Sequence, residues 1–153
     1  MLSDPKQVID FASLANKVGQ STIATADLFR HVMADGCTRL QTLKRSGKTA
    51  NIDRLIESHA WCDTALALIA IELPVWSIRR LIYDGGEWLC SLSRQPSLPI
   101  ELDDTAEFRH RVLPLAILGA LLEARQRTRG AHAPVALQIR PVSAHIMCCD
   151  NFA

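Results

Sequence analysis

The sequence lacks the features that mark several common classes of protein. Its net charge is only +1, from 17 Lys and Arg against 16 Asp and Glu residues, so no basic excess favours binding to nucleic acid. The start, from Met1 to Lys6, does not show the basic and then apolar layout of a secretory signal. The longest apolar run, from Val112 to Leu122, is about half of what a membrane span needs. These absences predict a soluble, cytoplasmic protein that does not bind membranes.

Motifs for catalysis, redox chemistry and phosphate binding are also missing. The five cysteines show no C-x-x-C spacing, which favours reduced thiols over a disulfide framework. Cys62 and Cys90 lie in apolar sequence, where a thiol usually only packs. No Gly-x-Ser-x-Gly motif is present, and residues 46–49 match only the end of a phosphate-binding loop, because the glycine required five residues before Gly47 is Thr42. We predict no cofactor, and the sequence leaves open whether the chain is an enzyme.

Apolar side chains, by contrast, are abundant. Hydrophobic residues make up 48% of the 153 residues, and the mean hydropathy of +0.09 is high for a soluble helical protein. A chain of this length forms one domain with a core of its own. Some apolar surface should then remain for a partner, most simply a second copy of the chain. We therefore predict a homo-oligomer.

Apolar residues recur at helical spacing along most of the chain. The predicted helices cover residues 3–19, 21–36, 38–44, 51–72, 74–94 and 103–129. From these helices we predict an all-α fold. Residues 1–130 should form a single-domain helical bundle of five or six helices. The segment 65–71 is apolar all round and should be deeply buried. The segment 112–122 is apolar on every side, and Pro114 can kink the last helix. For residues 131–153, which show no helical stripe, we predict a C-terminal tail that is either disordered or forms one short strand.

The most unusual stretch, residues 73–94, holds two of the three tryptophans and the only tyrosine. Pro74 suits the first turn of a helix, and Gly85 falls at the centre of an apolar helical face. The opposite face carries a mixture of aromatic and charged residues, namely Trp76, Arg80, Tyr83, Glu87 and Arg94.

Interfaces use such mixtures because aromatic rings and guanidinium groups combine large contact area with planar charged donors. We predict that this face of residues 76–94 binds a protein partner or a small ligand, without catalysis. The alternative for the same pattern is that neighbouring helices cover both faces of the central helix.

A metal-dependent helical-bundle enzyme is a first rival function. Its candidate ligands are His59, Asp63, Glu87, Glu107 and His110. Glu107 and His110 have the Glu-x-x-His spacing of carboxylate-bridged bundles, but a second such motif is absent. A mononuclear site would use His59, Glu87 and His110. The ordinary alternative is a buried His59–Asp63 pair, with Glu107 near a helix start where the dipole favours it.

A helix–turn–helix DNA-binding regulator is a second rival. Residues 25–48 can form two helices around an Asp35-Gly36 turn. Basic side chains would then border the second helix, at Arg39, Lys44, Arg45 and Lys48. Only Gln41 and Thr42 offer neutral polar groups to base edges, and ordinary helix packing explains the same pattern, so DNA binding is the weaker hypothesis.

Overall fold

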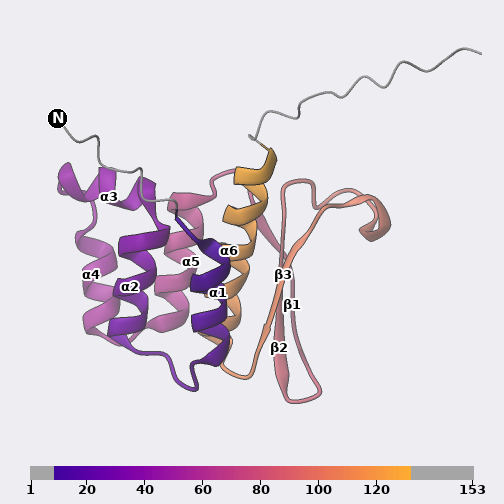
Figure 1. Cartoon of the computed structure of the whole chain (residues 1–153), viewed down its shortest axis with the longest axis horizontal. Coiled ribbons are helices and arrows are strands. Elements are labelled where there is room, and N and C mark those ends of the chain that lie inside the picture. The colour runs from indigo at the N-terminus through magenta and orange to yellow at the C-terminus, as the bar shows by residue number, and fades with distance from the viewer. Residues whose placement is uncertain (1–8, 132–153) are drawn as a thin grey trace, which may run out of the picture.

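The computed structural model describes residues 9–131 and shows six α-helices and a three-stranded antiparallel sheet (Figure 1). The prediction of an all-α helical bundle is therefore wrong, because two of the predicted helical segments contain strands. The elements in chain order are α1 (Phe11–Gln20), α2 (Ala26–Gly36), α3 (Thr38–Arg45), α4 (Ala50–Glu57), α5 (Trp61–Glu72), β1 (Ser77–Asp84), β2 (Glu87–Ser93), the 3₁₀ turn η1 (Ile100–Leu102), β3 (Ala106–His110) and α6 (Leu113–Ala131). The predicted tail, residues 131–153, lies almost wholly outside the described residues.

The first two helices follow their predicted apolar stripes. Asp10 caps α1 by accepting a hydrogen bond from the amide of Ser13, and Thr25 caps α2 in the same way through Leu28. Most of the apolar residues predicted to line one side of each helix are buried, namely Phe11, Leu14, Ala15, Val18, Leu28, Phe29, Val32 and Met33, whereas Ala12, predicted on the same side, is exposed. For α1 and α2, helical periodicity therefore predicted which side of the helix packs against the core.

The helix predicted over residues 51–72 is divided into α4 and α5. His59 lies between them with φ of 58°, a left-handed conformation that a helix cannot contain. The division turns α5 so that Ala65, Leu68 and Ile69 are buried while Leu66 is exposed. The expected deep burial of residues 65–71 is therefore only partly correct.

The predicted central helix is a β-hairpin. Asp84 pairs with Glu87 across the two-residue turn Gly85-Gly86, whose φ angles are 61° and 85°. Two successive residues with positive φ form the turn that suits the twist of a hairpin, and glycine adopts it without steric cost. The turn reverses the chain, so β2 runs back along β1 as far as the pair Ser77–Ser93.

The last predicted helix also begins later than expected, at Leu113 and not at residue 103. The ten or so residues before it contain η1 and β3, which pairs antiparallel with β2 from Leu92–Ala106 to Trp88–His110. Pro114 is consequently in the first turn of α6, where its missing N–H costs no hydrogen bond. The reason for expecting a kink there is removed.

Helix α6 is the centre of the fold. In Figure 1 it stands between the other helices and the sheet, and it contacts α1, α5, β2 and β3. Every residue from Leu115 to Leu122 is buried, whereas Val112, Leu113 and Pro114 of the same apolar segment are half-buried. The ring of Phe108 on β3 lies directly over the backbone of Gly119, where any Cβ atom would overlap it. This close approach brings β3 and β2 against α6, whereas β1 makes few or no contacts with that helix.

Within residues 9–131, no helix combines the length and the apolar character that crossing a membrane requires.

Candidate binding surface

Within the described residues, β1 is an edge strand of a sheet whose order is β1-β2-β3. It is eight residues long, contains neither Pro nor Lys, and exposes large apolar side chains. The exposed fractions are 36% for Ile78, 40% for Leu81, 44% for Ile82 and 59% for Tyr83. Soluble proteins usually protect such an edge with short strands, charges or a covering segment. We call the turn-side half of this strand, residues 80–84, the β1 edge.

The geometry of the hairpin determines which backbone groups of the β1 edge are free. In a two-residue hairpin the closing pair, here Asp84 and Glu87, exchanges both hydrogen bonds, and such pairs alternate with pairs that exchange none. Ile82 and Arg80 therefore bond to β2. The N–H and C=O groups of Leu81 and Tyr83 are directed away from β2, toward the open side of the sheet.

The side chains of the β1 edge alternate between the two faces of the sheet. Leu81 and Tyr83 lie opposite Cys90 and Trp88, on the face that α6 covers farther along the sheet. Tyr83 packs on Trp88 with ring centroids 5.1 Å apart. Because α6 packs mainly on β2 and β3, Leu81 and Tyr83 are left exposed beside it as an apolar overhang.

The other face carries the charges. Arg80 and Glu107 lie on either side of Ser91 in the register, and Arg80 donates a hydrogen bond of 2.8 Å from Nη2 to Glu107 Oε1. Burial alone would raise the pKa of Glu107, but the hydrogen bonds and the charge of Arg80 outweigh it and leave the pKa below its usual value. Asp84, exposed at the turn, has no ion-pair partner within residues 9–131.

The connection between β2 and β3 covers Arg79 in the opposite half of β1. At the bulge beside Ile78, Arg79 pairs with Asp103, which is 3% exposed, and also donates to the carbonyl of Leu98. Figure 1 shows η1 and this connection at the end of the sheet remote from the hairpin turn. The cover therefore stops before the β1 edge begins.

The five residues predicted to share one helical face are dispersed on the hairpin. Trp76 is buried, and Arg94 stacks over its ring with 5.2 Å from Cζ to the centroid. Arg80 and Tyr83 are both on the β1 edge but on opposite faces, and Glu87 begins β2. The prediction of one shared face fails because alternation in a strand replaces the helical period.

Sequence reasoning missed the apolar members of the surface, Leu81 and Ile82, since it assigned them to a buried helical face. The signal that identifies them is the Gly85-Gly86 pair flanked by Ile82 and Tyr83 on one side and Trp88 on the other, because a glycine pair between such residues is typical of a hairpin.

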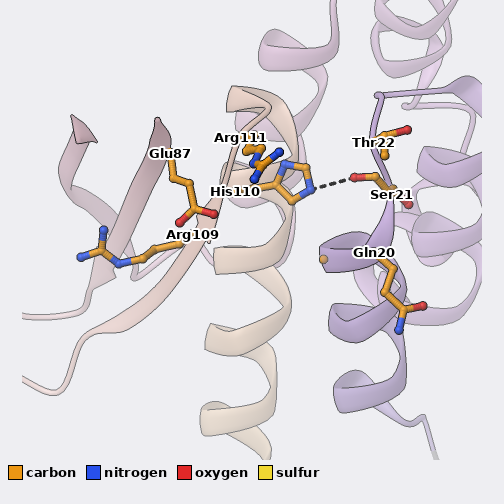
Figure 2. A pocket seen from close by; sticks show the side chains of 8 residues that line it. Gln20, Ser21, Thr22, Glu87, Arg109, His110 and Arg111 are labelled. Carbon is orange, nitrogen blue, oxygen red and sulfur yellow. Dashed lines mark hydrogen bonds between the residues drawn. The ribbon is translucent and has the colours of Figure 1, made fainter. Parts of the chain in front are cut away.

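Glu87 lines a pocket of about 370 Å³ between the sheet and the end of α1 (Figure 2). Its wall consists of Gly19, Gln20, Ser21, Thr22, Glu87, Arg109, His110 and Arg111. His110 accepts a hydrogen bond at Nδ1 from the amide of Val112, so Nε2 carries the proton and donates to the carbonyl of Ser21 at 2.8 Å. Because the backbone occupies both ring nitrogens, the pocket offers no free imidazole for acid–base chemistry.

The five metal-ligand candidates do not come together. His59 is exposed and stacks on Trp61, whereas Asp63 is exposed on α5, so the buried His59–Asp63 pair is absent. Glu107 and His110 are three apart on a strand, where they point to opposite faces. Among residues 9–131 no three His, Cys, Asp or Glu side chains are grouped as metal ligands.

The helices proposed for DNA binding, α2 and α3, are separated only by Cys37. Glu72 of α5, which is 3% exposed, accepts hydrogen bonds from the amides of Leu40 at 2.7 Å and Arg39 at 3.4 Å. Gln41 donates to the carbonyl of Met33. These contacts fix α3 to the core and use one of the two side chains that were candidates for base contacts.

The described cysteines are packing residues and not nucleophiles. Burial raises the pKa of Cys90 to about 12, and burial followed by the charge of Glu72 raises that of Cys37 even further. Burial and Asp63 also raise the pKa of Cys62. All three thiols are free and stay protonated at neutral pH.

Comparison of the chain with protein-family models, curated proteins and solved structures gave no match. Its function is therefore inferred from its own surfaces.

Proposed function

We propose that this protein is a non-catalytic binding protein that docks a partner on the β1 edge. The observation that carries the proposal is the combination of free backbone groups at Leu81 and Tyr83 with exposed apolar side chains on the same strand. An extended segment that pairs with a sheet edge gains backbone hydrogen bonds, and alternate side chains add specificity. The predicted contact residues Arg80 and Tyr83 belong to this surface, whereas Trp76 and Arg94 support the base of the hairpin.

A binding role fits the chemistry of the described residues better than catalysis does. The thiols have raised pKa values, and His110 is held at both ring nitrogens. No thiol lines the pocket and its imidazole is engaged, so Glu87 is the one carboxylate there and has no neighbouring nucleophile activated by a base. Four large apolar side chains of β1, in contrast, are exposed close together on one strand, and clustered exposed apolar groups are typical of binding surfaces.

The test is a photo-crosslinking amino acid placed at Tyr83 in the full chain, in the cells that produce it. We expect a discrete adduct, identified by mass spectrometry, that is lost when Leu81→Lys is added to the same chain. The matched control places the crosslinker at Ile23, which is 64% exposed in the α1–α2 connection. If position 83 yields no adduct beyond those of position 23, the β1 edge is not a docking site and the proposal fails.

A further inference from the structure

The β1 edge has a charge pattern that selects its partner. Arg80 and Asp84 are four residues apart on one face of the strand, with Ile82 between them. Arg80 uses Nη2 for Glu107, which leaves Nη1 for a second carboxylate. Asp84 is exposed and without an ion-pair partner in the described residues. An antiparallel partner strand should therefore offer an acidic group opposite Arg80 and a basic group opposite Asp84.

The strand β1 itself meets this requirement. We propose, building on the docking function above, that the partner is a second copy of the chain, paired antiparallel along β1 with Ile82 on the two-fold axis. In this register Arg80 faces Asp84 of the second copy, and Leu81 faces its Tyr83. The axis makes every contact occur twice, as in other isologous dimers. The two sheets join into one continuous six-stranded sheet.

The backbone permits this register and disfavours its neighbours. Leu81 and Tyr83 carry the outward-directed groups, so they exchange hydrogen bonds with Tyr83 and Leu81 of the second copy. Ile82 and the Arg80–Asp84 pairs then occupy the non-hydrogen-bonded positions, where side chains approach most closely. A register with Arg80 opposite Arg80 places two like charges together. A shift of one residue places the outward N–H and C=O groups of Leu81 opposite Ile82 of the second copy, whose own groups already bond to β2.

The apolar overhang supports the same arrangement. Because α6 packs mainly on β2 and β3, the exposed Leu81 and Tyr83 from two copies form one apolar strip between the two α6 helices. On the face of the sheet opposite α6, the side chains of Ile82 from the two copies pack against each other. The exposed apolar side chains of the β1 edge are thus removed from water by the copy that supplies the complementary charges.

The first test is sedimentation velocity of the full chain over a micromolar concentration series. We expect dimers that Ile82→Lys converts into monomers, since two ammonium groups then meet on the axis. Leu102→Lys is the matched control, because Leu102 is 73% exposed on η1 and away from the β1 edge; it should leave the dimer intact. A wild-type chain that stays monomeric contradicts the self-pairing, while an adduct at position 83 to another protein would still support the docking function.

The second test reads the register through charge reversal. In a homodimer of Asp84→Arg, each introduced guanidinium group faces Arg80 of the second copy. The double variant Arg80→Glu with Glu107→Arg keeps an ion pair inside the chain, but the carboxylate introduced at position 80 faces Asp84 of the second copy. Like charges therefore meet in both homodimers, whereas a heterodimer of the two variants has opposite charges at both positions.

We expect each charge variant alone to be monomeric and their mixture to form heterodimers. Misfolding cannot produce this gain of association on mixing. A mixture that stays monomeric, or homodimers of either variant as stable as the wild type, would overturn the register.

Discussion

The two edges of the sheet differ in what lies against them. β3 is five residues long, and its side chains tie it to the helices: Phe108 packs on Gly119 of α6, and His110 donates to the carbonyl of Ser21 beside α1. β1 is eight residues long and exposes Leu81, Ile82 and Tyr83. Among the described residues, the side chains of β1 make no comparable contact with a helix on the half next to the turn. The difference indicates that β3 builds the fold and that the β1 edge is kept for recognition.

The largest expected effect is on the free energy of unfolding, and it differs between substitutions in β3 and in the β1 edge. Phe108→Ala should lower the free energy of unfolding by about 3 kcal/mol, because it leaves a cavity over α6. Tyr83→Ala should cost about 1 kcal/mol or less, the contribution of its contact with Trp88. Urea unfolding at concentrations that keep copies apart measures both. Similar losses for the two variants would remove the distinction between the edges.

Gly119 tests how closely β3 approaches α6. Gly119→Ala should destabilise the chain by about 1–3 kcal/mol, since the new methyl group overlaps the ring of Phe108. Gly130→Ala is the matched control in the same helix, because no atom lies within 4 Å of its Cβ position. There alanine should be neutral or add up to about 1 kcal/mol of stability. The account is wrong if both substitutions shift the urea midpoint in the same direction.

Substitution of Gly85 by alanine distinguishes a hairpin from a helix, because the change in stability has opposite sign in the two structures. In a helix Gly85→Ala would add about 1 kcal/mol of stability. In the hairpin, where φ is 61°, alanine is strained and the same change should remove about 1 kcal/mol. Gly85→Asn should be nearly neutral, because asparagine accepts a positive φ in this turn. Stabilisation by alanine in urea unfolding would contradict the hairpin on which the β1 edge depends.

The smallest effect concerns the charges beside the β1 edge. The pKa of Glu107 is lower in the folded chain than usual, so its contribution to stability is present above its unfolded value of about 4.3. That contribution is lost as the pH falls through the lower, folded pKa. Because both partners are about one-third exposed, we expect about 0.5 kcal/mol or less.

Urea unfolding of Glu107→Gln and wild type between pH 7 and pH 3 measures this contribution. The difference between them should shrink on acidification. A variant of exposed Glu101, Glu101→Gln, supplies the control for a general change in charge. A Glu107→Gln difference that is constant with pH would show that the ion pair with Arg80 does not contribute.

Much of the helical part of the fold could be predicted from the sequence. The stripes of α1 and α2 and the buried segment of α6 follow from local spacing, since each helix meets the core along a pattern that its own residues define. The hairpin could not be identified by the same spacing. Leu81, Ile82 and Leu89 fit a helical wheel as well as two strands, and the bulge at Arg79 interrupts the alternation that would have favoured strands.

The candidate surface was predicted only in part, for a related reason. Arg80 and Tyr83 were recognised by residue type, which does not depend on the element that carries them. Their grouping with Trp76 and Arg94 depended on the helical period and failed with it. Exposure of the β1 edge follows from the place where α6 ends its cover of the sheet, and no local pattern contains that information.

The central claim is that the N–H groups of Leu81 and Tyr83 are free in a single chain and bonded when two copies pair. Amide hydrogen exchange followed by NMR tests it most directly, on the wild type and on Ile82→Lys over a range of concentrations. We predict that both amides become more protected as the wild-type concentration rises and that they exchange rapidly in Ile82→Lys at every concentration. Rapid exchange in concentrated wild-type protein, or equal protection in monomeric Ile82→Lys, would contradict the account.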